Sequence, residues 1–362
     1  MRFLSGAAAL AAMILCAGAA QAQGPRAIEL SAKAAFKHRH SKVQLPSQLA
    51  GLPRTKALEY EADQLDTMSE YATADVGEAY SVYIYRSVAG SLPVWFDRAR
   101  WMIEHRATLG AATLRSAGEF VPPGRTNASG LLATYGLAGQ GYRSTGVAIV
   151  PAGEWTIKLR ASSKTLAPAE LEAKMKSALA EIVWPKKMAP APAAAPVAPC
   201  STALALAGDA KPAEKDEDSL AETMMGALIG MTASQQSPER AASPPAVRWC
   251  RDSIELPEAG VYRADEQTDG YFLAVADAGR GVSVARSAGR FLDDGAEGRK
   301  ERPERYEVHM ILLSQTLTSG LLDRLPPPAQ ALAIAKEGRF ASSFGTWGKG
   351  KGQLTIGDEV IR

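Results

Sequence analysis

Histidine is scarce in this chain, so any histidine-based chemistry must draw on four residues, His38, His40, His105 and His309. His38 and His40 flank Arg39, and this spacing would place two imidazoles on one face of a strand, an arrangement that metal sites use. Arg39 adds positive charge, and no cysteine or carboxylate pattern nearby completes a ligand set. The stretch therefore favours a solvated basic loop, and we expect neither a metal nor a cofactor.

The other two histidines have structural interpretations. His309 lies inside residues 305–313, a strand-like run in which a packed or cross-strand histidine is the ordinary case. His105 is near the end of an expected helix, where a cationic imidazole interacts favourably with the helix dipole. If the protein is an enzyme, His309 with a nearby serine or aspartate is the leading candidate for a general base.

Residues 345–352, GTWGKGKG, nearly match a phosphate-binding loop, with two glycines five residues apart followed by Lys351. The match fails at Gly352, where the magnesium-binding serine or threonine should stand, and a strand rather than a helix is expected to follow. The stretch is typical of a flexible basic hairpin turn.

Other motifs are weaker still. Asp277, Asp293 and Asp294 show none of the alternate-position spacing of a calcium loop. The chain has no G-x-S-x-G nucleophile elbow and no H-E-x-x-H zinc motif. Asn127 begins an N-A-S sequon, which has meaning only in a host that glycosylates. The sequence therefore assigns no catalytic, cofactor-binding or metal-binding residue.

Residues 1–22 have the features of a secretory signal peptide: Arg2, an apolar run over residues 6–18 and an A-Q-A cleavage site. The alternative is a retained membrane anchor, but the apolar run is shorter than the ~20 residues that a membrane span needs. We therefore expect a periplasmic or secreted protein, without a membrane span in the mature chain.

Two cysteines remain after the signal peptide, Cys200 and Cys250. An exported chain permits them to form a disulfide bond. The chain-entropy estimate for a loop of this length is roughly 4 kcal/mol of stabilisation. The alternative is two unpaired thiols in an oxidising compartment.

The clearest fold signal lies in residues 141–185, which predict a hairpin and then a helix. Residues 142–150 and 155–160 alternate as two strands around a turn at residues 151–154. On the second strand, Trp155, Ile157 and Leu159 form the apolar face, and the opposite face is expected to be solvated. The solvated face comprises Thr156, Lys158 and Arg160. The helix begins at Pro168, carries one apolar stripe and ends before Pro185. The stripe consists of Leu171, Met175, Leu179 and Ile182.

The preceding chain predicts more strands and one helix. Residues 78–86 carry aromatic side chains on both faces, which indicates a central strand covered on both sides. Residues 91–106 form an amphipathic helix with a broad aromatic face, for which packing on a sheet is the expected role. Further strands are expected at residues 56–62, 112–120 and 131–137. In this pattern, residues 56–185 resemble the PsbP type of α/β/α sandwich, without a shared motif that would transfer functional residues.

Composition divides the chain into an N-terminal α+β domain over residues 23–185, a Pro/Ala-rich linker over residues 186–246 and a C-terminal mainly-β domain over residues 247–362. We expect two antiparallel sheets with flanking helices, an α+β fold. A short methionine-rich helix near residues 219–231 could lie on one of the domains or enter a partner's groove. The second domain is expected to contain strands at residues 260–264, 270–276, 281–286, 305–313, 340–344 and 353–356, with a helix at residues 329–336.

These features indicate a class of function rather than a reaction. The formal net charge of +2 gives no electrostatic argument for nucleic acid or a bare membrane surface as partner. We expect an exported, non-catalytic envelope protein that binds another protein or a small ligand. The alternative is a periplasmic hydrolase whose catalytic residues are dispersed along the chain. The sequence carries no signal for the oligomeric state.

Overall fold

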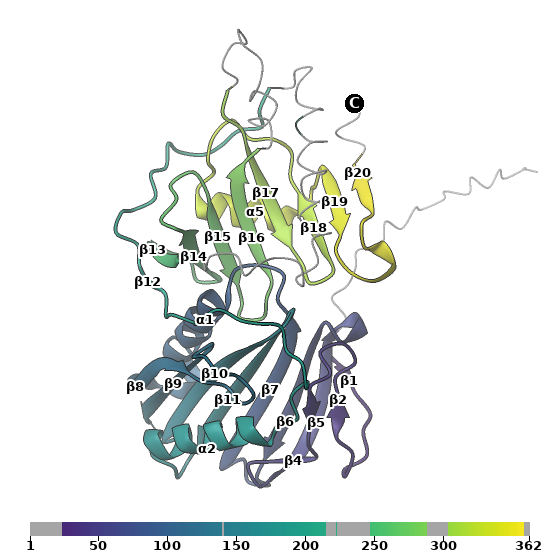
Figure 1. Cartoon of the computed structure of the whole chain (residues 1–362). Helices are drawn as coiled ribbons and strands as arrows, with labels where there is room; N and C mark the ends of the chain where they lie inside the picture. The colour runs from purple at the N-terminus through teal and green to yellow at the C-terminus, as the bar shows by residue number, and fades with distance from the viewer. Residues whose placement is uncertain (1–23, 140, 215–221, 223–246, 288–302, 358–362) are drawn as a thin grey trace, which may run out of the picture.

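The computed structural model describes residues 24–139, 141–214, 222, 247–287 and 303–357. These residues form an α+β fold of two domains, each built on a predominantly antiparallel sheet, as predicted (Figure 1). The expected signal peptide lies outside the described residues, as does the helix expected over residues 219–231 apart from Glu222. No helix in the described part of the chain is long and apolar enough to cross a bilayer.

The first domain contains a sheet with the strand order β1-β5-β6-β7-β11-β10-β9-β8, in which β4 also pairs with β5. A small hairpin of two short strands, β2 and β3, packs beside it. The strands are β1 (Arg26–Ala27), β2 (Phe36–Lys37), β3 (Gln44–Leu45), β4 (Gln48–Leu49), β5 (Leu52–Glu61), β6 (Asp66–Ala72), β7 (Glu78–Arg86), β8 (Ala111–Phe120), β9 (Gly130–Ala138), β10 (Ser144–Ala152) and β11 (Trp155–Ser163). The sheet places the predicted hairpin, β10 and β11, at its centre.

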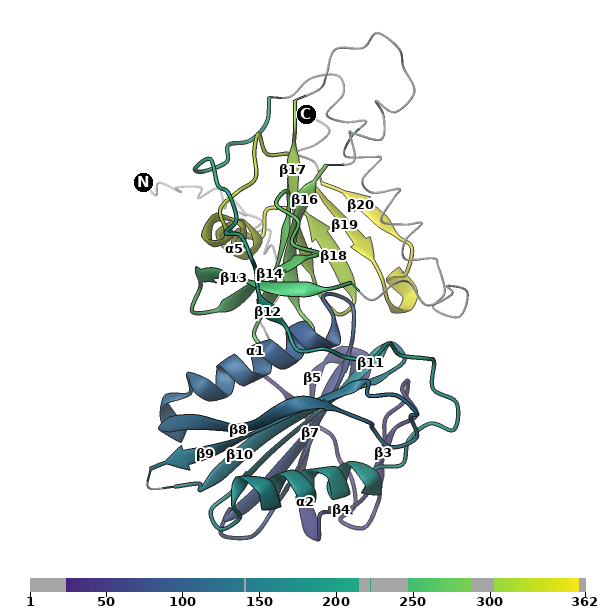
Figure 2. The same cartoon turned by 60° about the vertical axis from the view of Figure 1, so that its left-hand side comes forward.

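Two helices cover opposite faces of this sheet (Figure 2). Helix α2 (Pro168–Glu181) buries the predicted apolar stripe against the face that also carries Ile157 and Leu159. Helix α1 (Leu92–Glu104) covers the other face through Val94, Phe96 and Ile103. The one-helix-per-face arrangement follows from the two amphipathic patterns, because each apolar stripe must be buried against the sheet.

The second domain is a meander in which strands β12 to β20 pair in chain order. Only the short β12 runs parallel to its neighbour. The strands are β12 (Ala198–Pro199), β13 (Trp249–Glu255), β14 (Ala259–Ala264), β15 (Tyr271–Val275), β16 (Gly281–Arg286), β17 (Tyr306–Ile311), β18 (Gln315–Thr318), β19 (Ser342–Gly345) and β20 (Leu354–Ile356). Helix α5 (Pro328–Glu337) packs on one face against β16 and β17.

Helix α1 belongs to the cores of both domains. Figures 1 and 2 show it between the two sheets. Trp95 contacts Phe272 of β15 with the rings 5.9 Å apart and nearly perpendicular. The neighbouring Asp97 accepts a hydrogen bond from the Tyr262 hydroxyl at 2.8 Å. The buried guanidinium of Arg98 donates to the backbone carbonyl of Ala276 at 3.1 Å. The aromatic face therefore packs on a sheet, as expected, and its helix also contacts the second domain.

The polar face of β11 corrects one expectation. Thr156 and Lys158 are buried rather than solvated, with 2 % and 1 % of their surface exposed. The turn between β15 and β16 covers Lys158, whose ammonium lies 2.8 Å from the Asp277 carboxylate. Burial would raise the pKa of Asp277, but the charges of Lys158 and Arg160 outweigh it and lower the pKa. The side chains of β11 alternate as predicted, but its polar side is covered by the second domain, a long-range contact that a local pattern does not encode.

The connection between the domains is an extended strap, defined here as residues 185–199. It lies along the first domain, where Asn127 donates its side-chain amide to the Ala191 carbonyl at 2.7 Å and the Ala194 amide donates to the Ala128 carbonyl at 2.9 Å. The Asn127 amide nitrogen, the atom that a glycan would modify, is thus already hydrogen-bonded to the strap. The linker is extended as its composition predicts, and it is also held by the first domain.

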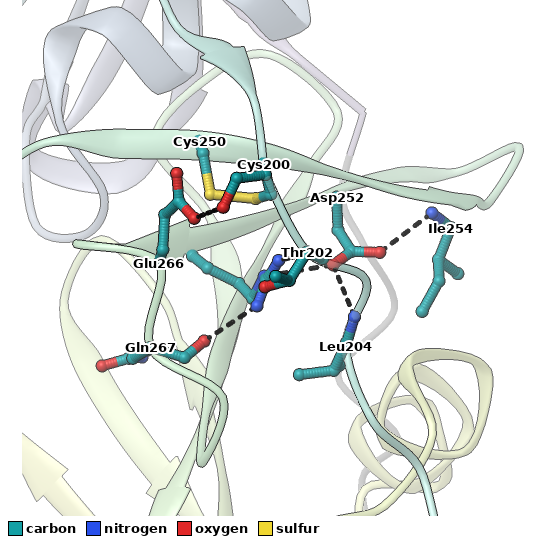
Figure 3. Close-up of a disulfide and its surroundings, with 10 residues drawn as sticks. Cys200, Thr202, Leu204, Cys250, Asp252, Ile254, Glu266 and Gln267 are labelled. Atoms are coloured by element: carbon teal, nitrogen blue, oxygen red, sulfur yellow. Dashed lines mark hydrogen bonds and ion pairs between the residues drawn. A yellow bond between two sulfur atoms is a disulfide. The ribbon is translucent and has the colours of Figure 1, made fainter.

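The strap ends at the predicted disulfide bond, which joins Cys200 to Cys250 (Figure 3). Beside it, Asp252 accepts hydrogen bonds from the backbone amides of Leu204 and Ile254, both at 3.1 Å. Asp252 also pairs with Arg263 at 3.1 Å, and both side chains are fully buried. Leu204 and Ala210 enter the second hydrophobic core. Residues that composition placed in the linker therefore belong to the structure of the second domain, because the disulfide and Asp252 fix them there.

Candidate ligand-binding pocket

A pocket of about 460 Å³ lies where the second domain contacts one end of the first sheet. Its walls come from the loop between β2 and β3, the turn between β10 and β11, the start of the strap and the turn between β19 and β20. The lining residues are Arg39, His40, Ser41, Lys42, Ala152, Gly153, Glu154, Trp155, Pro185, Lys187, Met188, Ala189 and Trp347. Its volume is within the range of small-molecule sites, roughly 300 to 1,000 Å³.

The pocket unites three stretches that the sequence analysis treated separately. The histidine pair supplies His40, the central hairpin supplies Trp155, and the glycine-rich turn supplies Trp347. The rings of His40 and Trp155 are nearly parallel, with centroids 5.9 Å apart, and Trp347 stands perpendicular to both. Because three aromatic rings from distant parts of the chain contact one another here, the pocket has a stiff aromatic wall.

Local backbone geometry sets the position of Trp347. Gly348 and Gly352 adopt positive φ angles of 62° and 81°, a region that glycine enters without steric cost. The Thr346 amide donates to the Ser314 carbonyl at 2.8 Å, and Arg86 of β7 donates to the Thr346 hydroxyl at 3.0 Å. The glycines therefore form a hairpin turn, as predicted, and contacts with the first domain hold it.

Asp63 connects the two sides of the pocket. Its carboxylate accepts hydrogen bonds from the Trp347 indole and from Arg39, both at 2.7 Å. The Trp347 bond is the main reason that the pKa of Asp63 is lowered, and His40 and Arg39 add to it. Asp63 has a φ of 58°, a left-handed conformation that aspartate tolerates better than most residues. No local sequence pattern marks Asp63 as a partner of Trp347, because the two residues are 284 positions apart.

His38 has a structural role and corrects the expectation of a solvated loop, because its side chain is buried. Its Nε2 donates to the Gln64 carbonyl at 2.8 Å, and its Nδ1 accepts from the Ser41 amide at 3.1 Å. Both ring nitrogens are therefore occupied, in a tautomer that only the neutral imidazole has. Burial lowers the pKa of His38 to about 4. The two imidazoles lie at a strand end and in a turn rather than along one strand. In the described part of the chain no group of three metal-binding side chains occurs.

His309 lies in the second domain on β17, in the strand predicted for it. Its Nδ1 lies 3.0 Å from the Thr318 hydroxyl and its Nε2 lies 3.7 Å from the Glu307 carboxyl. Burial lowers the pKa of His309 to about 4. Both nitrogens face neighbours in their own sheet, and the residue does not line the pocket. This geometry is that of a packed cross-strand histidine.

The remaining candidates have other roles. His105 follows α1 and hydrogen-bonds through Nδ1 to the Trp101 carbonyl at 2.9 Å, at the helix end where it was expected. Asp277 pairs with Lys158 at the domain interface, while Asp293 and Asp294 lie outside the described residues. The sequence analysis missed Lys42 and Lys187, because single lysines in loops carry no recognisable pattern.

No protein-family model, curated protein or solved structure matches the chain. The resemblance of the first domain to the PsbP type therefore has no support from a solved structure.

Proposed function

We propose that this protein is an exported, non-enzymatic binding protein that holds a small ligand in the pocket between its two domains. One observation carries the proposal: Trp155 and Trp347 come from different domains and meet in a pocket of about 460 Å³. Aromatic walls with a few polar groups are typical of small-molecule sites, which often lie at domain interfaces.

The expected location is consistent with this role. A signal-peptide-like start and the Cys200–Cys250 disulfide are features of exported proteins. The periplasm or the extracellular space is therefore the proposed site of action. The hydrolase alternative has less support, because its leading base, His309, has both ring nitrogens directed at neighbours in its own sheet.

A ligand screen with a blocked variant tests the proposal. The mature protein is screened by thermal shift against a chemically mixed library of small molecules, since a ligand that binds only the folded state raises Tm. Each hit is then retested on Ala189→Trp, which places an indole in the pocket. Ala195→Trp is the matched control, because Ala195 is exposed on the same strap but does not line the pocket.

The expected result is that hits stabilise the wild type and Ala195→Trp but not Ala189→Trp. The proposal is wrong if no compound stabilises the protein, or if Ala189→Trp responds to the hits as the wild type does.

A further inference from the structure

Two lysines that line the pocket have no carboxylate partner among the described residues. Lys42 lies in the β2–β3 loop. Its ammonium donates to the Arg39 backbone carbonyl at 2.8 Å. Lys187 is exposed at the start of the strap. The two come from segments far apart in sequence and line the same pocket. A cation without a counterion attracts an anionic ligand.

The acids around the pocket do not offset these charges, because they already have cationic partners. Asp63 accepts from Arg39 and from Trp347, both at 2.7 Å. Glu154, the acid that lines the pocket, lies 3.9 Å from Arg86. The net charge of the pocket lining therefore remains positive.

The aromatic wall limits the kind of anion further. Trp347 and His40 are partly exposed and line the same pocket as the two lysines, whereas Trp155 behind them is 5 % exposed. An aromatic ring is the group that packs best against such a wall, in stacked or edge-to-face contact. A small inorganic anion would use only the lysines and leave this apolar surface uncovered.

Building on the proposed ligand-binding function, we infer that the pocket takes a small aromatic carboxylate. The ring packs against Trp347 and His40, with Trp155 behind them, and the carboxylate is bound by Lys42 and Lys187. In this arrangement the ring contacts bury the apolar part of the ligand. The lysines favour an anionic ligand over a neutral one of the same shape.

Isothermal titration calorimetry with two probes of the same shape tests the inference. 4-Nitrobenzoate carries the carboxylate, and 4-nitrobenzamide replaces it with a neutral amide. Both are titrated into the mature wild type, the double variant Lys42→Gln/Lys187→Gln and the control Lys33→Gln. Lys33 is exposed and lies outside the pocket. Thermal melts establish that each variant is folded.

The expected result is that the wild type and Lys33→Gln bind the benzoate about tenfold or more tightly than the amide, since charge-assisted hydrogen bonds strengthen binding. In the double variant the benzoate affinity falls to that of the amide, and the amide affinity is unchanged. Equal binding of the two probes by the wild type, or full retention of benzoate binding by the double variant, would overturn the inference. So would the absence of binding by either probe. The proposed function is judged separately by the library screen with Ala189→Trp, so that the two can fail independently.

Discussion

The ammonium of Lys158 lies 2.8 Å from the carboxylate of Asp277, and this ion pair joins the centre of the first sheet to a turn of the second domain. Lys158 is 1 % exposed, and its ammonium also donates to the Asp277 backbone carbonyl at 2.7 Å. The tyrosine rings of Tyr83 and Tyr85 lie within 4.6 and 5.7 Å of the same nitrogen. The ammonium is thus enclosed by groups that compensate for the loss of water.

Asp277→Asn is expected to destabilise the protein strongly, because it leaves the buried Lys158 charge without its counterion. Breaking a buried pair in this way typically costs about 3–5 kcal/mol. Urea unfolding of the wild type and the variant measures the loss. Glu172→Gln breaks the partly exposed pair with Lys176 and, as the control, should cost less than about 1 kcal/mol.

A double variant separates the lost charge from other effects of the substitution. Lys158→Met added to Asp277→Asn removes the unpaired ammonium, so part of the lost stability should return. If the double variant is no more stable than Asp277→Asn alone, the uncompensated charge is not the cause.

We expect the protein to lose stability in mild acid because of the buried His38. Burial lowers its pKa from 6.5 to about 4, so the unfolded chain binds the proton first. The contribution of neutral His38 to the free energy of unfolding is fully present above pH 6.5 and is lost as the pH falls toward 4. Over that window the free energy of unfolding falls by about 1.4 kcal/mol per pH unit. His38→Gln should reduce this slope in urea unfolding measured across that window. His105→Gln, an exposed control, should keep the wild-type slope. Equal slopes for the wild type and His38→Gln would contradict the assignment.

The contribution of Glu307 to the free energy of unfolding is expected to have the opposite pH dependence. Burial, with a smaller effect from the Glu222 charge, raises its pKa from 4.5 to about 8. The folded protein therefore keeps this carboxyl protonated, and its contribution to stability is lost as the pH rises from 4.5 through 8. Glu307→Gln, which stays neutral, should show a smaller decline in the free energy of unfolding over that window. Glu119→Gln, on the exposed edge strand β8, serves as the control and should decline as the wild type does. An unchanged decline in Glu307→Gln would show that the carboxyl ionises freely.

Removal of the Cys200–Cys250 disulfide bond is expected to lower the stability of the protein. It links cysteines 50 residues apart, for which the chain-entropy estimate is about 4 kcal/mol. Cys200→Ser/Cys250→Ser should lower the free energy of unfolding by up to that amount. A maleimide reagent should label no thiol in the mature protein when it is denatured without reductant. Labelling of two thiols per chain would show that the cysteines are unpaired.

Local patterns predicted much of the fold. The hairpin of β10 and β11 and the stripe of α2 were found because alternation and helical spacing depend only on near neighbours in sequence. β6 was missed, since Asp66, Thr67 and Ser69 are polar and yet buried between neighbouring strands. Its polar side chains are covered by tertiary contacts that the local sequence does not encode.

The pocket was less predictable than the fold. His40 and the turn that contains Trp347 both stand out in the sequence, but their patterns predict two unrelated loops. Asp63 and Trp347, which the structure joins, are 284 residues apart. Contacts at that separation arise only from the docking of the two domains, so neither residue type nor spacing reveals them.

The position of α1 between the two sheets has an evolutionary consequence. From Leu92 to Ile103 no side chain of this helix is fully exposed, whereas α2 has a solvent face along much of its length. A substitution in α1 must therefore remain compatible with the packing of both sheets. A substitution in one domain that alters this packing must be compensated by one in the other. We expect α1 and the strands it contacts to change together among homologues, and α2 to vary freely on its outer side.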